Sequence, residues 1–266
     1  TNHQSLVTSH PLTILHDNFA RLPLPAWKGA GVAIPVFSLR SKKSFGTGEF
    51  TDLKLLVDLA KAIGLKMIQL LPVNDTTATY TWKDSYPYSA ISAFALHPLL
   101  LNLETVAGKE QAATVTALAS HKKRLNQLGK LDYEEVMKIK MAAIRDLFIL
   151  KKDSFRDDLN YIAFFELNRH WLEPYAAFAY LRDTYKTADF NVWRMYAVFD
   201  EHEVQELISP SRKQYDEISL HYFTQYHLHM QLKEATKYAH KNGVIIKGDI
   251  PIGICGLVKR EGLDDV

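Results

Sequence analysis

The sequence has little cysteine and no long apolar run. Its single thiol, Cys255, cannot form an internal disulfide and cannot build a cysteine-based zinc site. No uninterrupted apolar stretch is long enough to span a membrane. Residues 1–4 lack the basic and apolar regions of a signal peptide. These absences predict a cytoplasmic protein without disulfides, and a first residue that is Thr rather than Met suggests a chain cut from something longer.

The sequence also lacks an excess of either charge. Its 32 basic and 30 acidic residues are interspersed and leave a formal charge of +2. This pattern gives no electrostatic footprint for nucleic acid or for a membrane surface, so a neutral polar partner fits better. With 266 residues, 47% of them hydrophobic, the chain can bury a substantial core. Its length suits one large domain.

The first part of the chain predicts a linker followed by a βαβ unit. Residues 1–30 contain scattered prolines and no sustained period, which is typical of a linker. Residues 31–39 form a short apolar run that predicts a strand, with an edge or bulge at Pro35. A helix capped by Thr51 then precedes a second predicted strand at 66–71. Strand, helix and strand in this order imply parallel strands and an α/β fold.

The middle of the chain changes character. Amphipathic periodicity predicts helices over 133–152, 157–171, 175–183 and 220–242. A helical insertion, about 110–240, therefore separates the second strand from a third predicted strand at 244–250. The helical middle alone would also permit an all-helical scaffold, but the strands on both sides argue against it.

Asp249 stands at the end of the third predicted strand. Polar residues just beyond the carboxyl end of a buried parallel strand are where α/β proteins usually place their chemistry, so Asp249 is a site candidate. The alternative is an aspartate that caps a turn before Pro251. Position alone does not separate the two.

A second candidate is the loop 82–92, in which aromatic residues alternate with hydroxyls. Sugar rings are bound by such mixtures, because their C–H faces stack on aromatic planes while their hydroxyls need polar partners. The side chains in question are Trp82, Tyr86, Tyr88 and Ser89. A tyrosine-rich loop that merely packs against the core explains the same residues.

Other patterns have simpler interpretations. Residues 46–51 contain two glycines but not the third of the dinucleotide fingerprint. Cys255 has no defined base partner that would make it a nucleophile. We expect solvated helix positions rather than metal ligands at His221, His227 and His229. We expect an exposed charged rim at Asp200, Glu201, Glu203 and Glu206.

Several segments, taken in order, resemble the 4-α-glucanotransferases called amylomaltases or disproportionating enzymes. These segments are residues 31–41, 45–50, Gln-Leu-Leu-Pro at 69–72, Tyr-Pro-Tyr-Ser at 86–89 with 92–95, 171–172, 223–226 and Gly-Asp-Ile-Pro-Ile at 248–252. The variants at 74–77 and 85–88 look most like the disproportionating-enzyme-2-like branch, whose members carry starch-binding modules before the catalytic barrel.

The resemblance implies an interrupted (β/α)8 barrel that transfers α-1,4-glucan segments to a sugar acceptor with retention. Such chemistry uses two carboxyl groups about 5 Å apart and needs no cofactor or metal. Asp249 matches the aspartate at the end of the family's third strand, which supports the catalytic centre and is not the nucleophile. Tyr88 matches a tyrosine that lines the donor site, and Tyr86 stands where many members have serine. The implied partners are α-1,4-glucans and maltooligosaccharides.

The family's nucleophile lies in an Arg-x-Asp-His motif after strand four and its acid/base glutamate follows strand five. Neither motif occurs in this sequence, and Arg145-Asp146 and Arg182-Asp183 lack the spacing and the strand context. We therefore expect 31–266 to hold about three of the eight barrel strands and to lack transfer activity alone. The alternative is a non-catalytic maltodextrin-binding or regulatory fragment that uses Trp82, Tyr86 and Tyr88.

Overall fold

A parallel three-stranded sheet forms the base of the molecule. The computed structural model describes residues 28–254, so most of the predicted linker and Cys255 lie outside the described residues. Strands β1 (Gly31–Ile34), β2 (Met67–Leu70) and β4 (Ile245–Lys247) pair in the order β1-β2-β4. All pairings are parallel, with Ile68 facing Val32 on one side and Ile246 on the other. The predicted parallel arrangement of these strands is confirmed.

Two details at the start of the fold differ from prediction. Strand β1 ends before Pro35, and a 3-10 turn (Val36–Ser38) follows instead of further strand. Proline has no amide hydrogen to donate to a neighbouring strand, which accounts for the shorter element. Helix α1 (Leu53–Ala62) follows a 3-10 turn in which Glu49 and Asp52 form a reciprocal capping box. Thr51 is therefore not the cap.

Helices fill the stretch between β2 and β4. They are α2 (Leu103–Ala107), α3 (Ala112–Thr116), α4 (Ala119–Asn126), α5 (Tyr133–Arg156), α6 (Leu159–Tyr185), α7 (Glu201–Leu207) and α8 (Tyr215–Lys241). A break was expected between 171 and 175, but α6 runs through Pro174 without interruption. A proline inside a helix removes one hydrogen bond and crowds the carbonyl four residues earlier, at a cost of about 3 kcal/mol. The buried neighbours Trp171, Leu172 and Tyr175 anchor the helix on both sides of Pro174 and offset this cost.

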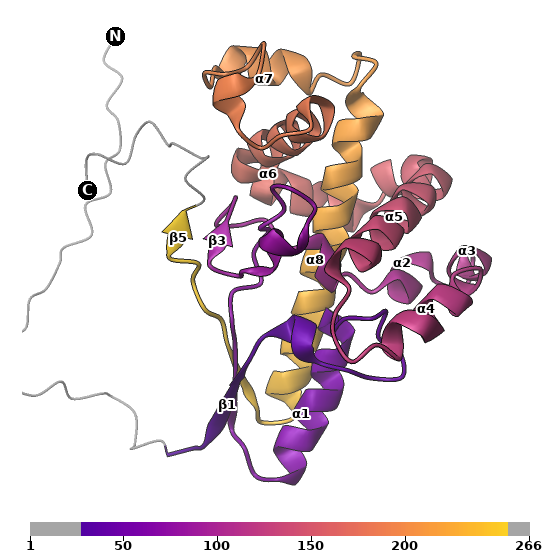
Figure 1. Ribbon diagram of the computed structural model, residues 1–266, viewed down its shortest axis with the longest axis vertical. Coiled ribbons are helices and arrows are strands. Elements are labelled where there is room, and N and C mark those ends of the chain that lie inside the picture. The colour runs from indigo at the N-terminus through magenta and orange to yellow at the C-terminus, as the bar shows by residue number, and fades with distance from the viewer. Residues whose placement is uncertain (1–27, 255–266) are drawn as a thin grey trace, which may run out of the picture.

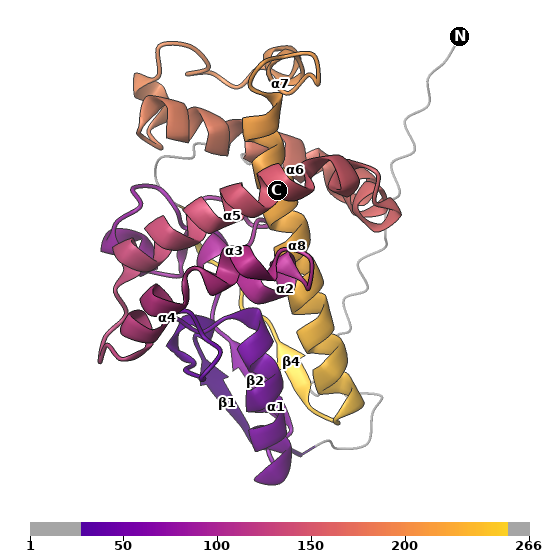
Figure 2. The ribbon, with the colours of Figure 1, turned by 90° about the vertical axis from the view of Figure 1, so that its right-hand side faces the viewer.

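Helix α8 joins the helical part to the sheet. It runs along the long axis of the molecule, so one end lies beside α1 and the sheet while the other lies among α6 and α7 (Figures 1 and 2). Two buried glutamines on α8 hold the segment 96–102 in place. Gln225 bonds both the N–H (2.8 Å) and the carbonyl (2.8 Å) of Leu96, and Gln231 does the same for Asn102 (2.8 and 3.0 Å).

A buried ion pair connects α5 to the start of the fold. Lys140 Nζ lies 2.5 Å from Glu49 Oε1, and both side chains are inaccessible to solvent. Lys140 also donates to the carbonyls of Leu99 (2.6 Å) and Leu101 (2.8 Å), while Asn102 donates to Glu49 Oε2 (2.6 Å). Lys140 thus supplies a donor to two backbone carbonyls of a buried segment.

The described helices include none that is both long and apolar enough to cross a membrane.

Candidate functional site

Asp249 lies beyond the carboxyl end of β4 and is half-buried. Its Oδ1 atom accepts from the N–H of Ile250 (3.1 Å), a local contact of the turn-capping type. Its Oδ2 atom accepts from the phenol of Tyr88 (3.2 Å), which is 161 positions away in the sequence. The structure therefore brings together two of the predicted site residues, and turn capping alone does not describe Asp249.

The phenol of Tyr88 responds electrostatically to this neighbour. Partial burial, the hydrogen bond to Asp249 and the charge of that carboxylate raise the pKa of Tyr88 above its ordinary value. Tyr88 consequently stays protonated and able to donate a hydrogen bond throughout the neutral range. The pair offers a carboxylate held in a fixed orientation beside an aromatic ring.

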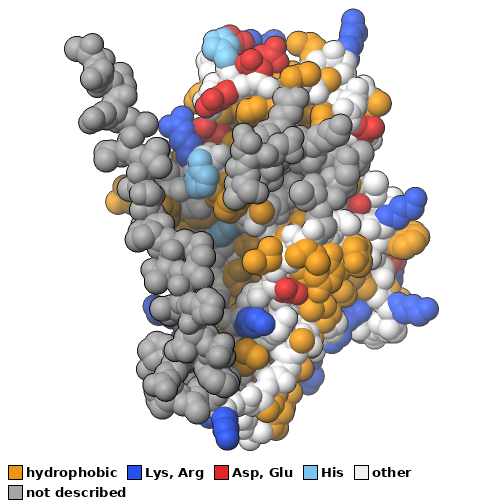
Figure 3. All heavy atoms as spheres, turned by 90° about the vertical axis from the view of Figure 1, so that its left-hand side faces the viewer, with side chains coloured by type: hydrophobic (Ala, Val, Ile, Leu, Met, Phe, Trp, Pro, Cys, Tyr) orange, Lys and Arg blue, Asp and Glu red, His pale blue; other side chains and the backbone are white. Residues whose placement is uncertain are grey.

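The loop around Tyr88 is held against the segment that follows Asp249. Strand β3 (Ser89–Ala90) pairs in parallel with β5 (Gly253–Ile254), so Ser89 lies opposite Gly253. Figure 1 shows these two short strands side by side, away from the main sheet. Figure 3 views the molecule from this side, and hydrophobic side chains gather across the described part of the face. Two segments distant in sequence thus form one local structure.

Tyr86 and Trp82 differ in how they relate to this pair. The ring of Tyr86 is 60% exposed and lies 5.7 Å from the Tyr88 ring at an angle of 50°. Trp82 starts a 3-10 turn (Trp82–Ser85) and is 67% exposed, and its backbone N–H donates to Glu134 of α5 (3.3 Å). The structure therefore groups Tyr86 with Tyr88 and Asp249, while Trp82 lies at the far end of the same loop.

Two buried aspartates shape the stretch leading into this loop. Asp75 accepts from the N–H of Thr77 (2.9 Å) and from the phenol of Tyr175 on α6 (2.7 Å). Asp84 accepts from the N–H groups of Thr79 (2.9 Å) and Tyr80 (2.6 Å). These bonds fix the backbone between β2 and the tyrosines, so the loop is braced by helix α6.

Arg182 of α6 completes this support. It donates to the carbonyl of Thr77 (2.8 Å), to the phenol of Tyr80 (2.6 Å) and to Asp183 (2.8 Å), and its guanidinium lies over the Tyr80 ring at 4.9 Å. Burial works to raise the pKa of Asp183, but the charge and hydrogen bonds of Arg182 outweigh it and hold that pKa below its ordinary value. The buried Arg182 and the 32% exposed Asp183 thus act together as an ion pair that holds the loop.

Sequence reasoning missed this network. Arg182-Asp183 was considered only as a catalytic motif, and Asp75 and Tyr175 were not singled out. The single charge of Arg182 at the end of the otherwise uncharged stretch 175–182 was the available signal, because a buried charge needs a partner.

The histidines of α8 are not solvated, contrary to the sequence prediction. His221 is buried 3.9 Å from Asp183, and burial lowers its pKa to about 4. Burial also lowers the pKa of His227 to about 4, and His227 lies 4.4 Å from the Phe223 ring. His229 is half-buried and contacts the carbonyl of Gln225 at 2.8 Å. The reason is that α8 is covered on several sides by other helices.

Two remaining expectations concern charged residues. No group of three or more His, Cys, Asp or Glu side chains able to hold a metal occurs within residues 28–254. The acidic cluster at 200–206 is exposed, as predicted. Asp200 caps α7 by accepting from the N–H of Glu203 (2.9 Å).

Comparison with known proteins gives a consistent result. Residues 34–263 match a family model described as 4-alpha-glucanotransferase. The chain is 44% identical over 228 residues to 4-alpha-glucanotransferase DPE2 of Oryza sativa subsp. japonica, covering 86% of this chain and 24% of that protein. It is 30% identical over 241 residues to the 4-alpha-glucanotransferase of Chlamydia muridarum, covering 88% and 42%. The chain therefore spans less than half the length of these relatives.

Solved structures share the fold. The amylomaltase from Streptococcus agalactiae in complex with acarbose gives a TM-score of 0.64 at 22% identity, over 85% of this chain and 44% of that one. The amylomaltase from Corynebacterium glutamicum gives 0.65 at 18% identity, over 85% and 30%.

Proposed function

The chain belongs to the 4-alpha-glucanotransferase family, and we propose that it contributes the Tyr88–Asp249 part of a glucan site to an enzyme that transfers α-1,4-glucan segments with retention. In this proposal β1, β2 and β4 are the first strands of a (β/α)8 barrel. Helices α2 to α7 and the start of α8 form an insertion between the second and third barrel strands. The cytoplasmic location and the linker at 1–30 stay predictions.

The contact between Tyr88 and Asp249 is the observation that carries the proposal. Asp249 stands just beyond the carboxyl end of a parallel strand, where barrel enzymes place their sites. Its carboxylate has lone pairs left over after the bonds from Tyr88 and Ile250, and these can accept hydrogen bonds from sugar hydroxyls. The exposed ring of Tyr86 offers a plane for the apolar face of a glucose unit.

The chain alone is proposed to be inactive in transfer. Retaining chemistry needs a nucleophilic carboxylate and an acid about 5 Å apart. The sequence contains no Arg-x-Asp-His motif, and Asp249 is assigned a supporting role. The alternative, a maltodextrin-binding fragment without catalysis, draws on the exposed rings of Trp82 and Tyr86. It shares Tyr86 and Tyr88 with the proposal, and it differs in giving the chain no part in a transferase.

A site-specific binding experiment tests the proposal. Maltoheptaose is titrated into the chain while the ring resonances of Tyr86 and Tyr88 are followed by NMR. Saturable shifts are expected, and Asp249→Asn should weaken binding about tenfold, because a charged hydrogen-bond acceptor is lost. Asp146→Asn, at an exposed position on α5, is the matched control. Unmoved tyrosine resonances would overturn the proposal, and release of glucose from maltotriose would overturn the predicted inactivity.

A further inference from the structure

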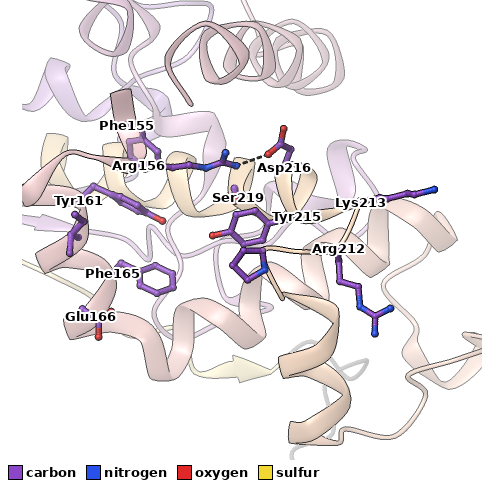
Figure 4. Close-up of a pocket in the computed structure, with 12 residues that line it drawn as sticks. Phe155, Arg156, Tyr161, Phe165, Glu166, Arg212, Lys213, Tyr215, Asp216 and Ser219 are labelled. Carbon is purple, nitrogen blue, oxygen red and sulfur yellow. Dashed lines mark hydrogen bonds and ion pairs between the residues drawn. The ribbon is translucent and has the colours of Figure 1, made fainter. Parts of the chain in front are cut away.

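A separate cavity of about 620 Å³ lies where the end of α5, the start of α6 and the start of α8 meet. Figure 4 shows side chains from these helices converging on it. Its volume is within the range of roughly 300–1,000 Å³ that is usual for small-molecule sites. The cavity shares no residue with the Tyr88–Asp249 site.

Two buried polar atoms of the cavity's lining residues lack hydrogen-bond partners. Ser219 is only 3% exposed, yet its hydroxyl has no hydrogen-bond partner within the described residues. The Nε–H of Arg156 is also buried without a partner there. Buried polar groups in folded proteins are normally satisfied, and leaving them unpaired is unfavourable. Both atoms are closed to solvent as the side chains stand, so a ligand would bond them only after a rotation of the Ser219 or Arg156 side chain toward the cavity. After that rotation, a ligand that carries both acceptors and donors would satisfy them.

The charges around the cavity favour a neutral ligand. Arg156 is already paired with Asp216 at 2.5 Å, and Asp216 also accepts from Lys152 (2.6 Å). Arg212 pairs with Glu206 at 3.2 Å. The lining carries the carboxylates of Asp216 and Glu166 and the cations of Arg156, Arg212 and Lys213, so an anion entering the cavity would meet both signs of charge. Hydroxyl groups, by contrast, can donate to the carboxylates and accept from the guanidinium.

Aromatic rings supply the other requirement of sugar binding. Tyr161, Phe165 and Tyr215 all line the cavity, and Figure 4 shows the three rings around its centre. The guanidinium of Arg156 lies over the Tyr215 ring at 5.3 Å, which orients that ring. Rings beside ionised side chains suit a ligand with an apolar face and a hydroxylated rim.

We propose that this cavity is a second carbohydrate site, which binds a short neutral oligosaccharide and holds an α-1,4-glucan away from the Tyr88–Asp249 pair. Its choice of α-1,4-glucan among neutral oligosaccharides rests on the proposed function. The presence of a carbohydrate site rests on Ser219, Arg156 and the three rings, and is independent of that function.

The test removes the first site and asks whether binding remains. In the chain carrying Tyr88→Ala and Asp249→Ala, calorimetry with maltoheptaose should still show saturable binding. Adding Ser219→Ala should weaken it about two- to tenfold, the range for one hydrogen bond. Because the Ser219 hydroxyl has no partner, this change should not lower thermal stability. Ser154→Ala, at an exposed serine of α5, is the control and should leave binding unchanged.

A second pair of variants tests the aromatic contribution. Tyr215→Ala should weaken maltoheptaose binding about tenfold, while Tyr238→Ala, near the other end of α8, should not. The cavity proposal would be overturned if the chain carrying Tyr88→Ala and Asp249→Ala bound no maltoheptaose. It would also be overturned if adding Ser219→Ala or Tyr215→Ala to that chain left its affinity unchanged. Either result would leave the proposed function standing. If the chain lacking Tyr88 and Asp249 binds maltoheptaose, and the Tyr86 and Tyr88 resonances of the unmodified chain do not move, the cavity proposal stands and the proposed function fails. Cellohexaose binding as tightly as maltoheptaose would contradict the choice of α-1,4-glucan and would show a site for neutral oligosaccharides in general.

Discussion

The phenol of Tyr88 donates a hydrogen bond to Asp249 across 161 positions of sequence. The bond joins the loop after β2 to the segment after β4, and the pairing of Ser89 with Gly253 reinforces the same junction. Both segments begin at the carboxyl ends of the neighbouring parallel strands β2 and β4, and the pairing of β3 with β5 brings them together away from the main sheet.

Neutralising Asp249 should lower the pKa of Tyr88. The pKa is raised in the folded chain by partial burial and by the Asp249 carboxylate, and Asp249→Asn removes the charged contribution. A raised tyrosine pKa stabilises the fold below the unfolded value of about 10, and this contribution is lost as pH rises through the folded pKa. NMR titration of labelled tyrosine rings measures the change. An unaltered Tyr88 titration in the variant would show that the hydrogen bond does not form in solution.

Arg182→Met should destabilise the chain by about 3 kcal/mol, because it removes the cation beside Asp183, which keeps only the Tyr80 phenol as a donor (2.8 Å), and leaves the buried Thr77 carbonyl without its donor. Urea denaturation measures the free energy of unfolding. Arg169→Met is the matched control on the same helix, since its ion pair with Glu173 involves an arginine side chain that is 53% exposed. That control should cost no more than about 0.5 kcal/mol. Equal losses in the two variants would contradict the buried role of Arg182.

The same pair predicts a pH dependence. The pKa of Asp183 is lowered in the folded state, chiefly by Arg182 against the opposing effect of burial. Its contribution to stability is therefore fully present above the unfolded pKa of about 3.9 and is lost as pH falls through the lower folded value. Asp183→Asn should flatten the acid limb of the stability curve in that window. An identical acid limb in both proteins would rule out this contribution.

Sequence patterns predicted the positions of the strands correctly, but they did not predict how far the helices are buried. The apolar runs before Pro35 and before Asp249 located β1 and β4. Both strands were expected to be buried, but their residues are exposed or half-buried in the structure. Pro174 predicted a break that tertiary packing overrides. Periodicity could not show that α8 is covered on several sides, so His221 was wrongly expected to be solvated.

The sequence predicted individual residues of the candidate site, but it did not predict the hydrogen-bond network that holds them. Tyr88 and Asp249 were singled out separately, by a tyrosine-rich loop and by a strand end. Their contact and the network of Asp75, Tyr175 and Arg182 depend on how α6 packs over the loop, which no local sequence pattern reports. Whether Ser89 and Trp82 contact a glucan stays a prediction.

Replacing Lys140 alone should lower the free energy of unfolding more than replacing both Lys140 and Glu49. Lys140→Met leaves the Glu49 carboxylate and the carbonyls of Leu99 and Leu101 unpaired, and should lower the free energy of unfolding by about 3–5 kcal/mol. Combining it with Glu49→Gln removes the stranded charge and should recover part of the loss, giving a favourable coupling energy in a double-mutant cycle. Strictly additive losses in urea denaturation would contradict this coupling.

Replacing the buried Gln225 of α8 should destabilise the segment that it bonds. Gln225→Leu leaves the N–H and carbonyl of Leu96 unpaired in the core, and should lower the free energy of unfolding by about 2–6 kcal/mol at roughly 1–3 kcal/mol for each group. Gln225→Glu keeps an acceptor for the N–H but loses the donor to the carbonyl and buries a carboxylate, so it should be no milder. Gln127→Leu, at an exposed position, should change stability by less than about 0.5 kcal/mol.

Because Leu96 lies just beyond the loop that carries Tyr88, Gln225→Leu should also weaken maltoheptaose binding at that loop. A stability loss with unchanged binding would show that the segment and the Tyr88–Asp249 site are independent.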